Sequence, residues 1–458
     1  MADEFGTPLY VYSAGTILDH YTRLDAALAP LDHLICYAIK ANSNRAILQL
    51  LADAGAGFDI VSGGELHRVL AAGGDPAKCT FAGVGKSREE IEYALDQRVY
   101  SFNVESEAEL EYIDRIAGTK NLRAPVAMRV NPDIDPRTHE YISTGSRESK
   151  FGIPMDRIPA VYQRAATMRN IDVVGVQMHI GSQITEAAPF GDAIAKVAPI
   201  VRDLKSRYQI KFFSIGGGLG IVYESSFESG AKEWWSVGRD RVSPARTRAR
   251  RGGREYRDSI TSTRTRPLSI QQYVDAILPP LRELKLRILL EPGRLLVGNA
   301  GVLLTRVRYI KHSGEKKFAI VDAGMNDLIR PALYHSYHEI VPVEEPTTRS
   351  VGEAVSFPSR QSRGKSMSKS KNKTEKMDIV GPVCESGDFF ALDREMPKVR
   401  EGDLLAIMSA GAYGFVMASN YNSRPLPAET LVGGDRFELI RRRQAWKDLV
   451  RDEVNADW

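Results

Sequence analysis

Short apolar segments alternate with amphipathic segments from about residue 30 to residue 300. Eight apolar segments have the composition of buried strands, and they are residues 34–39, 57–61, 79–82, 99–102, 125–130, 172–178, 210–215 and 286–290. Between several of them, apolar residues recur with helical spacing, as in Ala46–Ala54, Glu65–Ala72, Ser87–Leu95 and Ser106–Ile116. Eight strands separated by helices predict an α/β fold of the (β/α)8 TIM-barrel type.

The two ends of the chain depart from this alternation. Leu9–Tyr12 is a short expected strand, and the helix after it runs from its N-cap residue Ser13 to Ala29. Beyond residue 300, short strands follow one another without long helices, at Gly301–Tyr309, Lys317–Asp322, Asp378–Cys384 and Asp403–Met408. We therefore expect a barrel at 13–300 and a β-domain, sandwich or barrel, made of 301–458 together with the N-terminal strand in 1–12.

Two basic segments interrupt this plan. Residues 224–267 are rich in Arg, Ser, Thr and Gly and separate the seventh strand from its helix, and residues 347–376 are rich in Ser, Lys and Arg and split the β-domain. Because neither segment has helical or strand periodicity, both are expected to be disordered surface insertions. A role in RNA binding or targeting stays open for them, as does an origin in retained noncoding or misassembled sequence.

Composition narrows the class of protein. The 458 residues are 43% hydrophobic and 26% charged, which is typical of a globular chain with room for two domains. The net charge of +4 hides an excess of thirteen positive charges in 239–266 and 347–376, so the remainder carries about −9. An acidic body argues against specific nucleic-acid binding.

Membrane and metal signals are also missing from the sequence. No run of 18 apolar residues could span a bilayer, and the N-terminus has no signal-peptide pattern, so a cytoplasmic protein is expected, with a plastid location left open. The three cysteines, Cys36, Cys79 and Cys384, form no C-x-x-C pair. Neither a disulfide framework nor a metal site is therefore expected.

Functional residues of such barrels lie where the strands end and lead into the helices. The expected strand ends carry many polar or glycine residues: Lys40, Asp59 with Glu65, Gly83, Asn103, Arg129, His179, Gly216–Gly218 and Glu291 with Arg294. Lys40, in Tyr37–Asn42, ends the first strand. Such a lysine either extends its amine to solvent or is a nucleophile with a depressed pKa that can form a Schiff base. The polar residues at the other strand ends favour the second interpretation.

Segments 216–220 and 291–294 follow the seventh and eighth strands, where such barrels bind phosphate through backbone N–H groups and a nearby cation. The glycine run alone is a weak signal, because it lacks the G-x-G-x-x-G spacing and tight turns also need glycine. Combined with Lys40 and the Glu291 carboxylate, the two loops predict a pyridoxal phosphate site in which Glu291 keeps the pyridine nitrogen protonated. His179 would stack on the ring or would be an ordinary structural histidine.

Five motifs resemble, in order, those of the pyridoxal-phosphate-dependent decarboxylases with the alanine racemase fold, and they are Tyr37–Asn42, His179–Ser182, Gly216–Gly218, Glu291–Arg294 and Cys384–Asp388. The resemblance is greatest to the members that act on diaminopimelate and covers nearly the whole chain outside the two insertions. It implies that Lys40 carries the cofactor, that His179 stacks on it and that Glu291 pairs with its ring nitrogen. It implies a phosphate-binding set of Ser182, Gly217, Gly218, Gly293, Arg294 and Tyr413. Asp59 and Arg129 are implied to lie in the layer behind Lys40.

Glu291 also bears on the reaction type. Loss of CO2 from an amino acid leaves a carbanion that a protonated pyridinium stabilises, so a carboxylate at the ring nitrogen favours decarboxylation. By the same resemblance, racemases of this fold have arginine at that position, which keeps the ring nitrogen unprotonated.

Substrate choice depends on the distal end of the site. Arg294 and Arg330 would hold a distal carboxylate and Glu385 a distal ammonium, with Tyr334 and Tyr413 completing the substrate-binding set. A substrate with both distal groups is a diamino diacid such as meso-diaminopimelate, which would yield L-lysine and CO2. Ornithine-type substrates need only the acid, so Arg330 discriminates, unless it forms an ordinary surface ion pair.

The resemblance further implies a homodimer with shared active sites. In this arrangement the Cys384–Glu385 loop of one chain lies over the cofactor of the other, and the Cys384 thiol donates a proton. The alternative is that Cys384 is an ordinary buried cysteine without a catalytic role. The implied catalytic residues are Lys40, Cys384, His179 and Glu291. Two other functions stay open, a decarboxylase of ornithine, arginine or carboxynorspermidine and a noncatalytic regulatory homologue.

Overall fold

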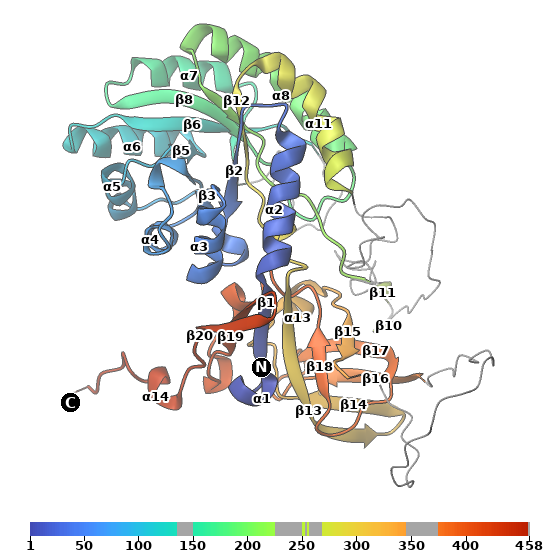
Figure 1. Cartoon of the computed structure of the whole chain (residues 1–458). Coiled ribbons are helices and arrows are strands. Elements are labelled where there is room, and N and C mark those ends of the chain that lie inside the picture. Colours follow the sequence, from blue (N-terminus) through green and yellow to red (C-terminus); the bar gives the residue numbers. More distant parts are fainter. Residues whose placement is uncertain (135–149, 225–249, 252–253, 256–267, 345–373, 457–458) are drawn as a thin grey trace.

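The computed structural model describes residues 1–134, 150–224, 250–251, 254–255, 268–344 and 374–456, in two structural regions (Figure 1). The first predicted insertion lies outside the described residues except for Glu224 and the short pair β10 (Arg250–Arg251) and β11 (Arg254–Glu255). The second lies outside them up to residue 373. The expected disorder of both segments therefore stays a prediction.

Within the described residues, eight parallel strands close into a barrel, which confirms the predicted fold. These strands are β2 (His33–Ala38), β3 (Gly57–Ile60), β4 (Cys79–Phe81), β5 (Ser101–Val104), β6 (Ala124–Asn131), β8 (Ile171–Met178), β9 (Phe212–Ser214) and β12 (Arg287–Leu290). Pairing of β5 with β6 and of β12 with β2 closes the ring, and the short β7 (Ile153–Pro154) adds to the edge of β6. Parallel strands buried on both faces account for the continuous apolar segments of the sequence.

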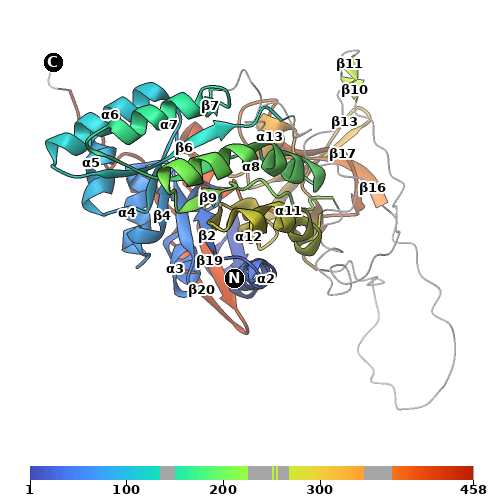
Figure 2. The ribbon, with the colours of Figure 1, turned by 90° about the horizontal axis from the view of Figure 1, so that it is seen from above.

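Helices surround the barrel (Figure 2). They are α2 (Ala14–Leu28), α3 (Arg45–Asp53), α4 (Gly63–Ala71), α5 (Arg88–Asp96), α6 (Glu107–Thr119), α7 (Ile158–Thr167), α8 (Ala188–Tyr208) and α11 (Ile270–Leu284). Serine N-caps begin several of them, because a serine oxygen accepts an otherwise unpaired N–H of the first turn. The predicted cap Ser13 accepts from Thr16 N at 3.2 Å, and Ser87 forms a capping box with Glu90.

The second region is a mixed β-domain below the barrel in Figure 1. Its strands are β1 (Leu9–Ser13), β13 (Gly301–Ser313), β14 (Lys316–Val321), β15 (Ile340–Pro342), β16 (Thr374–Val380), β17 (Phe389–Pro397), β18 (Leu404–Ile407), β19 (Ala428–Gly433) and β20 (Arg436–Arg441). The N-terminal strand β1 lies between β13, antiparallel, and β19, parallel, with Leu9 opposite Leu304 and Ala428. This confirms that the N-terminal strand joins the C-terminal domain, while the exact boundaries at residues 13 and 300 stay a prediction.

Two expected boundaries in the β-domain were wrong. Strand β16 begins at Thr374, so the last three residues of the predicted 347–376 insertion belong to the sheet. The same strand ends at Val380, where Gly381 and Pro382 interrupt the ladder, because proline has no N–H to donate. Cys384 therefore lies in the loop after β16 and not in a strand. No helix among the described residues is long and apolar enough to cross a bilayer.

Candidate active site

Lys40 and Asp59 form an ion pair at one end of the barrel. Lys40 lies two residues beyond the end of β2, in the 3-10 turn η1 (Ile39–Ala41), and Asp59 lies on the neighbouring strand β3. Lys40 Nζ donates to Asp59 Oδ2 at 2.5 Å. The Asp59 side chain is 1% exposed and that of Lys40 is 41% exposed, so the lysine side chain is partly accessible while its counterion is buried.

This pair corrects the expected pKa of Lys40. Burial by itself lowers the pKa of Lys40, but the Asp59 carboxylate, Tyr413 and the hydrogen bond to Asp59 outweigh it and raise the pKa above its ordinary value. The expectation of a depressed pKa was wrong for the free amine, because the sequence did not reveal that the Asp59 carboxylate would touch it. Asp59 Oδ1 is buried and has no hydrogen-bond partner within the part of the chain that the structure describes.

Glu291 follows β12, and its carboxylate accepts hydrogen bonds from polar side chains of three other barrel strands, β9, β8 and β5. Ser214 Oγ donates to Glu291 Oε1 at 2.7 Å, and Gln177 Nε2 donates to Oε2 at 3.0 Å. Asn103 Nδ2 adds a longer contact of 3.4 Å to Oε1. Burial, followed by the charge of Asp59, raises the pKa of Glu291 to about 7. A cation beside this carboxylate would return it to the ionised form.

His179 and the glycine loop after β9 lie against each other. His179 Nδ1 accepts a hydrogen bond from Gly217 N at 3.2 Å, which leaves the proton of the neutral ring on Nε2. Burial, then the charges of Arg129 and Lys40, lower the pKa of His179 well below its usual range, so the imidazole is neutral.

The glycines after β9 are required by geometry. Gly216 and Gly218 have φ values of +72° and +110°, which L side chains rarely adopt. A Cβ at Gly217 would lie 2.2 Å from the carbonyl oxygen of Glu291, so the loops after β9 and β12 can approach only without side chains. Glu291 N donates to Gly216 O at 2.8 Å and fastens the two loops together.

Arg294 begins α12 (Arg294–Val297) next to these loops and is 6% exposed. Its Nη2 donates to Ser182 Oγ at 3.1 Å, and its Nη1 donates to the Tyr223 hydroxyl. The guanidinium also lies 4.7 Å from the ring centroid of Tyr413, whose N–H bonds Ala41 O beside Lys40. Arg294 Nε is buried, and none of the described residues forms a hydrogen bond with it.

Arg330 begins α13 (Arg330–Tyr334) and is 2% exposed, so the alternative of a surface ion pair was wrong. Its Nε donates to His338 Nε2 and its Nη2 to Ser336 Oγ, each at 3.4 Å. The guanidinium lies 5.1 Å from the ring centroid of Tyr223 and 6.0 Å from that of Tyr334. Tyr223 thus contacts Arg294 and Arg330, and among the described residues neither arginine forms an ion pair with a carboxylate. Two buried guanidinium groups with neutral partners are suited to bind an anion.

Arg129 anchors a second buried layer. Its Nη1 donates to Glu105 Oε1 at 2.9 Å, and Glu105 Oε2 accepts from Gly152 N at 2.9 Å. Glu105 N in turn donates to Glu109, which also pairs with Lys86 at 2.6 Å. The charge of Arg129 also lowers the pKa of His179, while its place behind Lys40 stays a prediction.

Cys384 and Glu385 lie in the loop between β16 and β17. Cys384 is exposed, so the alternative of an ordinary buried cysteine was wrong for this chain, whereas Cys36 and Cys79 are buried. Cys384 N donates to Asn422 Oδ1 at 3.2 Å, and Glu385 N donates to Val383 O at 2.8 Å. Within this loop the side chains of residues 384–386 are exposed.

The residues described above fit pyridoxal phosphate. Four buried polar atoms of this set have no hydrogen-bond partner among the described residues, namely Asp59 Oδ1, Arg129 Nη2, Gln177 Oε1 and Arg294 Nε. Buried polar atoms are normally paired, so such a concentration indicates a polar group that the site is built to receive. The neutral imidazole of His179, the carboxylate of Glu291 and the bare glycine backbone match a ring, a ring nitrogen and a phosphate.

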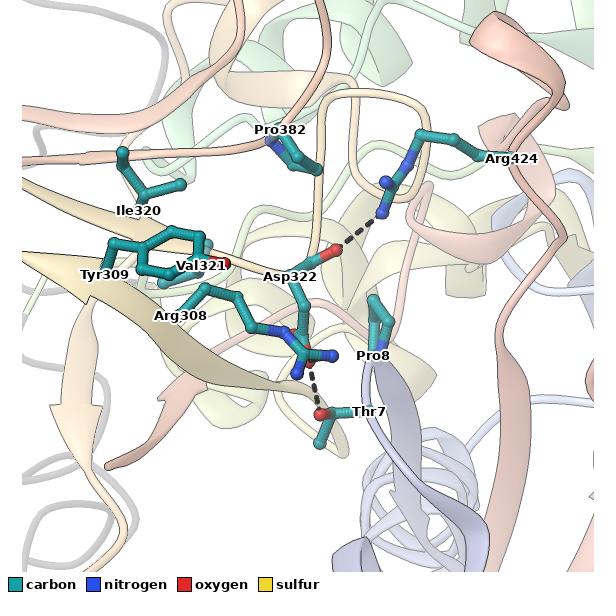
Figure 3. Close-up of a pocket in the computed structure, with 9 residues that line it drawn as sticks. All are labelled: Thr7, Pro8, Arg308, Tyr309, Ile320, Val321, Asp322, Pro382 and Arg424. Atoms are coloured by element: carbon teal, nitrogen blue, oxygen red, sulfur yellow. Dashed lines mark hydrogen bonds and ion pairs between the residues drawn. The ribbon is translucent and has the colours of Figure 1, made fainter. Parts of the chain in front are cut away.

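A shallow pocket of about 270 Å³ in the β-domain is distinct from this site (Figure 3). It is lined by Thr7, Pro8, Arg308, Tyr309, Ile320, Val321, Asp322, Pro382 and Arg424. Its two arginines are already engaged, because Arg308 pairs with the Asp322 carboxylate at 3.3 Å and Arg424 Nη2 donates to Asp322 O at 2.6 Å.

Sequence reasoning gave no role to several residues of the site: Gln177, Ser214, Tyr223, Glu105, Ser336 and His338. For Gln177 and Ser214 a signal existed, because each is a polar residue two positions before a strand-end residue, on the same face of its strand. Tyr223 and His338 gave no such signal, since their contacts with Arg294 and Arg330 join distant parts of the chain.

Comparison with known proteins identifies the family. The family model described as the pyridoxal binding domain of pyridoxal-dependent decarboxylases matches residues 14–247. The diaminopimelate decarboxylase of Vibrio cholerae is 43% identical over 451 residues, covering 98% of this chain and 93% of that protein. That of Pseudomonas aeruginosa is 45% identical over 454 residues, covering 99% and 94%. Among solved structures, the diaminopimelate decarboxylase of Helicobacter pylori complexed with L-lysine has a TM-score of 0.81 at 37% identity, over 97% of this chain and 96% of that one.

Proposed function

The chain belongs to the pyridoxal-dependent decarboxylases, among the diaminopimelate decarboxylases, and we propose that it converts meso-diaminopimelate to L-lysine and CO2, the last step of lysine biosynthesis. The observation that carries the substrate assignment is the pair of buried guanidinium groups, Arg294 and Arg330, which both contact Tyr223. Substrates without a distal carboxylate would leave the Arg330 charge buried and unpaired, which is costly.

The cofactor would be held by residues at the strand ends. Lys40 would carry it covalently, with Asp59 fixing the position of the lysine nitrogen, and His179 would support the ring as a neutral imidazole. The N–H groups of Gly217 and Gly218, with Arg294, would receive its phosphate, to which Ser182, Gly293 and Tyr413 are adjacent. When bound, pyridoxal phosphate supplies an electron-accepting ring that stabilises the negative charge left by loss of CO2.

Glu291 would hold the proton on the ring nitrogen. Its ability to do so follows from its donors, since Ser214 and Gln177 orient the carboxylate and favour its charged form, against the effect of burial. Ionised Glu291 and a protonated ring nitrogen stabilise each other in this low-dielectric site. The chain thereby favours decarboxylation over racemisation.

At the other end of the site, Arg330 would orient the substrate. His338 Nδ1 lies 2.8 Å from Met408 O, so this nitrogen carries the proton and Nε2 is left to accept from Arg330. Burial, then the charge of Arg330, lowers the pKa of His338 to about 3, which keeps it an acceptor at neutral pH. The guanidinium is thus oriented by neutral groups and keeps its charge available for a distal carboxylate.

A homodimer would complete the site. The Cys384–Glu385 loop would lie over the cofactor of the partner chain, with the thiol of Cys384 donating the proton that replaces CO2 and Glu385 binding the distal ammonium. Exposure of Cys384 on a loop of the β-domain supports this arrangement.

We also propose a cytoplasmic location. The three cysteines are free, which agrees with a reducing compartment.

Decarboxylation of three compounds tests the proposed function. Purified protein with pyridoxal phosphate is given meso-diaminopimelate, L,L-diaminopimelate or L-ornithine, and CO2 and the amine product are measured. We expect CO2 and L-lysine from the meso compound and little turnover of the other two. Equal or faster turnover of ornithine would overturn the substrate assignment.

A further inference from the structure

Two loops of the β-domain leave the same end of the sheet side by side. One, residues 322–329, follows β14 and leads to Arg330, and the other, residues 381–388, follows β16 and carries Cys384. Strands β14 and β16 are parallel neighbours, with Phe318 opposite Asp378, so their carboxyl ends coincide. The topology therefore places the two segments that carry the proposed substrate and acid groups next to each other.

Asp388 joins these loops. Its side chain is buried, Oδ1 accepts from Met325 N at 2.6 Å in the first loop, and Oδ2 accepts from Val383 N at 2.6 Å in the second. Space for the carboxylate comes from Gly381, where a Cβ would lie 2.4 Å and 2.5 Å from the two oxygens. Charge-assisted bonds of this length are among the stronger hydrogen bonds in proteins.

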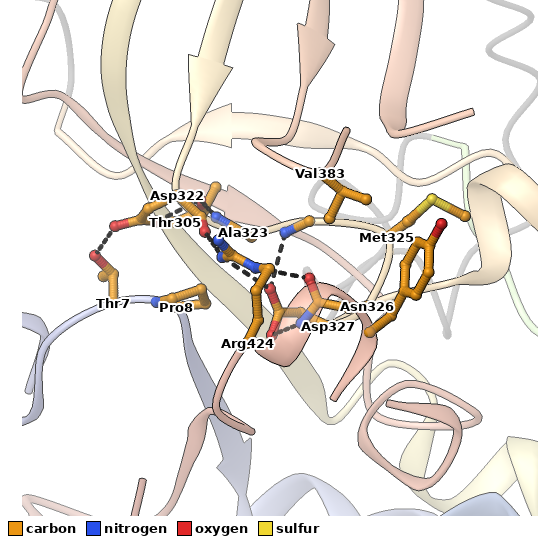
Figure 4. A network of polar contacts seen from close by, with 12 residues as sticks. Thr7, Pro8, Thr305, Asp322, Ala323, Met325, Asn326, Asp327, Val383 and Arg424 are labelled. Atoms are coloured by element: carbon orange, nitrogen blue, oxygen red, sulfur yellow. Dashed lines mark hydrogen bonds and ion pairs between the residues drawn. The ribbon is translucent and has the colours of Figure 1, made fainter. Parts of the chain in front are cut away.

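The 322–329 loop is itself firmly held (Figure 4). Arg424 Nε donates to Asn326 Oδ1 at 2.9 Å and its Nη2 to Asp322 O at 2.6 Å. Asp327 Oδ2 accepts from Gly324 N at 2.8 Å, and Tyr10 OH donates to Asp327 O at 2.6 Å. Asp388 thus attaches the Cys384 loop to the 322–329 loop, which is itself held by Tyr10 of the N-terminal strand and by Arg424.

We infer that Asp388 is a positioning residue that fastens the Cys384–Glu385 loop to the segment carrying Arg330. In its consequences for activity, this inference rests on the proposed function and the proposed shared site. In a dimer, the Asp388 carboxylate would then fix the position of two groups. One is Cys384, which acts in the partner's site, and the other is Arg330, which acts in the site of its own chain. The fastening itself is independent of any reaction.

Hydrogen exchange tests the fastening directly. Amide exchange at Met325 and Val383 is followed by mass spectrometry in wild type, Asp388→Asn and Gly381→Ala, because an Asn amide offers only one acceptor and an alanine Cβ displaces the carboxylate. We expect slow exchange in wild type and an increase of about tenfold at these amides in both variants. The matched control is Asp378→Asn, since Asp378 is equally buried and accepts from Asp393 N at 2.6 Å without touching either loop. Fast exchange in wild type, or an equal increase in the control, would overturn the inference.

Mixed dimers separate the two consequences. Chains with different affinity tags are coexpressed and the mixed species is purified, so that Lys40→Ala in one chain leaves a single competent barrel. If the Lys40→Ala chain also carries Asp388→Asn, the competent barrel receives the loosened loop, and kcat should fall by up to about 100-fold. If the partner carries Asp388→Asn instead, its own Arg330 support is loosened, and KM for the diacid should rise.

The reference is the mixed dimer of Lys40→Ala with wild type, and the same placements of Asp378→Asn should match it. If neither Asp388→Asn placement differs from the reference, the positioning role is overturned. A defect only when Asp388→Asn and Lys40 are in the same chain would instead refute the shared site. If the wild-type dimer does not turn over meso-diaminopimelate at all, the proposed function is refuted. The exchange result stands in both of these cases.

Discussion

Replacing Glu291 with glutamine should have opposite effects on the stability of the protein without cofactor and on its activity. The carboxylate is 7% exposed, and burial raises its pKa to about 7 from an ordinary value of 4.5. Because the folded pKa is the higher one, the folded state binds more protons than the unfolded state between these values. The contribution of Glu291 to stability therefore falls as pH rises through this window. Once the buried group is ionised, it lowers the free energy of unfolding by about 3 kcal/mol, at 1.36 kcal/mol for each unit by which the pKa is raised.

Glutamine removes that charge and can keep the contacts. The oxygen of the new glutamine would accept from Ser214. Its amide would donate to Gln177 Oε1, which has no partner among the described residues, once the Gln177 amide has flipped to point this oxygen at residue 291. Glu291→Gln without cofactor should therefore have a higher Tm than wild type at pH 8 and an equal Tm near pH 4.5. With cofactor its kcat/KM should fall on the order of 100- to 1,000-fold, because the ring nitrogen loses its carboxylate.

The assay is thermal unfolding by circular dichroism at several pH values, on protein freed of cofactor, alongside kinetics of the reconstituted enzyme. A Tm for Glu291→Gln that is below wild type at pH 8 would refute the reasoning, since burial of the charge would then not be the dominant cost. Undiminished activity would refute the role of the carboxylate at the ring nitrogen.

Three further predictions concern the substrate, the insertions and the dimer. Arg330→Ala should weaken transition-state binding of the diacid by about 2–5 kcal/mol, because the pair with the distal carboxylate is desolvated, and steady-state kinetics with meso-diaminopimelate measure this as kcat/KM. Deletion of 239–266 and 347–373 with short Gly/Ser joints should leave cofactor binding and activity intact, since each doubling of loop length costs only about 0.6 kcal/mol; loss of soluble protein would show that these segments pack. Lys40→Ala and Cys384→Ala chains, each nearly inactive, should give about a quarter of wild-type activity when refolded together, and mixed dimers without activity would exclude a shared site.

Much of the fold was predictable because its signals are local. Barrel strands buried on both faces appear as apolar segments, and Ser13 is a preferred N-cap residue directly before a helical pattern. The strand-end rule then selected Lys40, Asp59 and Glu291 without knowledge of their contacts.

Properties that depend on contacts between distant segments were not predictable. The pKa of Lys40 was expected to be depressed, yet it is raised because Asp59 on the next strand lies against the amine. Similarly, the orientation of Arg330 depends on His338, whose tautomer is set by the carbonyl of Met408. The start of β16 was missed because Thr374–Lys376 has the composition of the basic segment before it, and only its pairing with β17 makes it a strand.

Reduction of the purified protein with borohydride tests the central claim most directly, namely that Lys40 carries pyridoxal phosphate. The account predicts a visible absorption band that borohydride abolishes, and peptide mapping should then find the reduced cofactor attached to Lys40. Lys40→Ala should bind no cofactor covalently, whereas Lys86→Ala, which removes another buried lysine, should still be labelled at Lys40. Cofactor attached to a lysine other than Lys40, or a protein with no reducible band after reconstitution, would contradict the account.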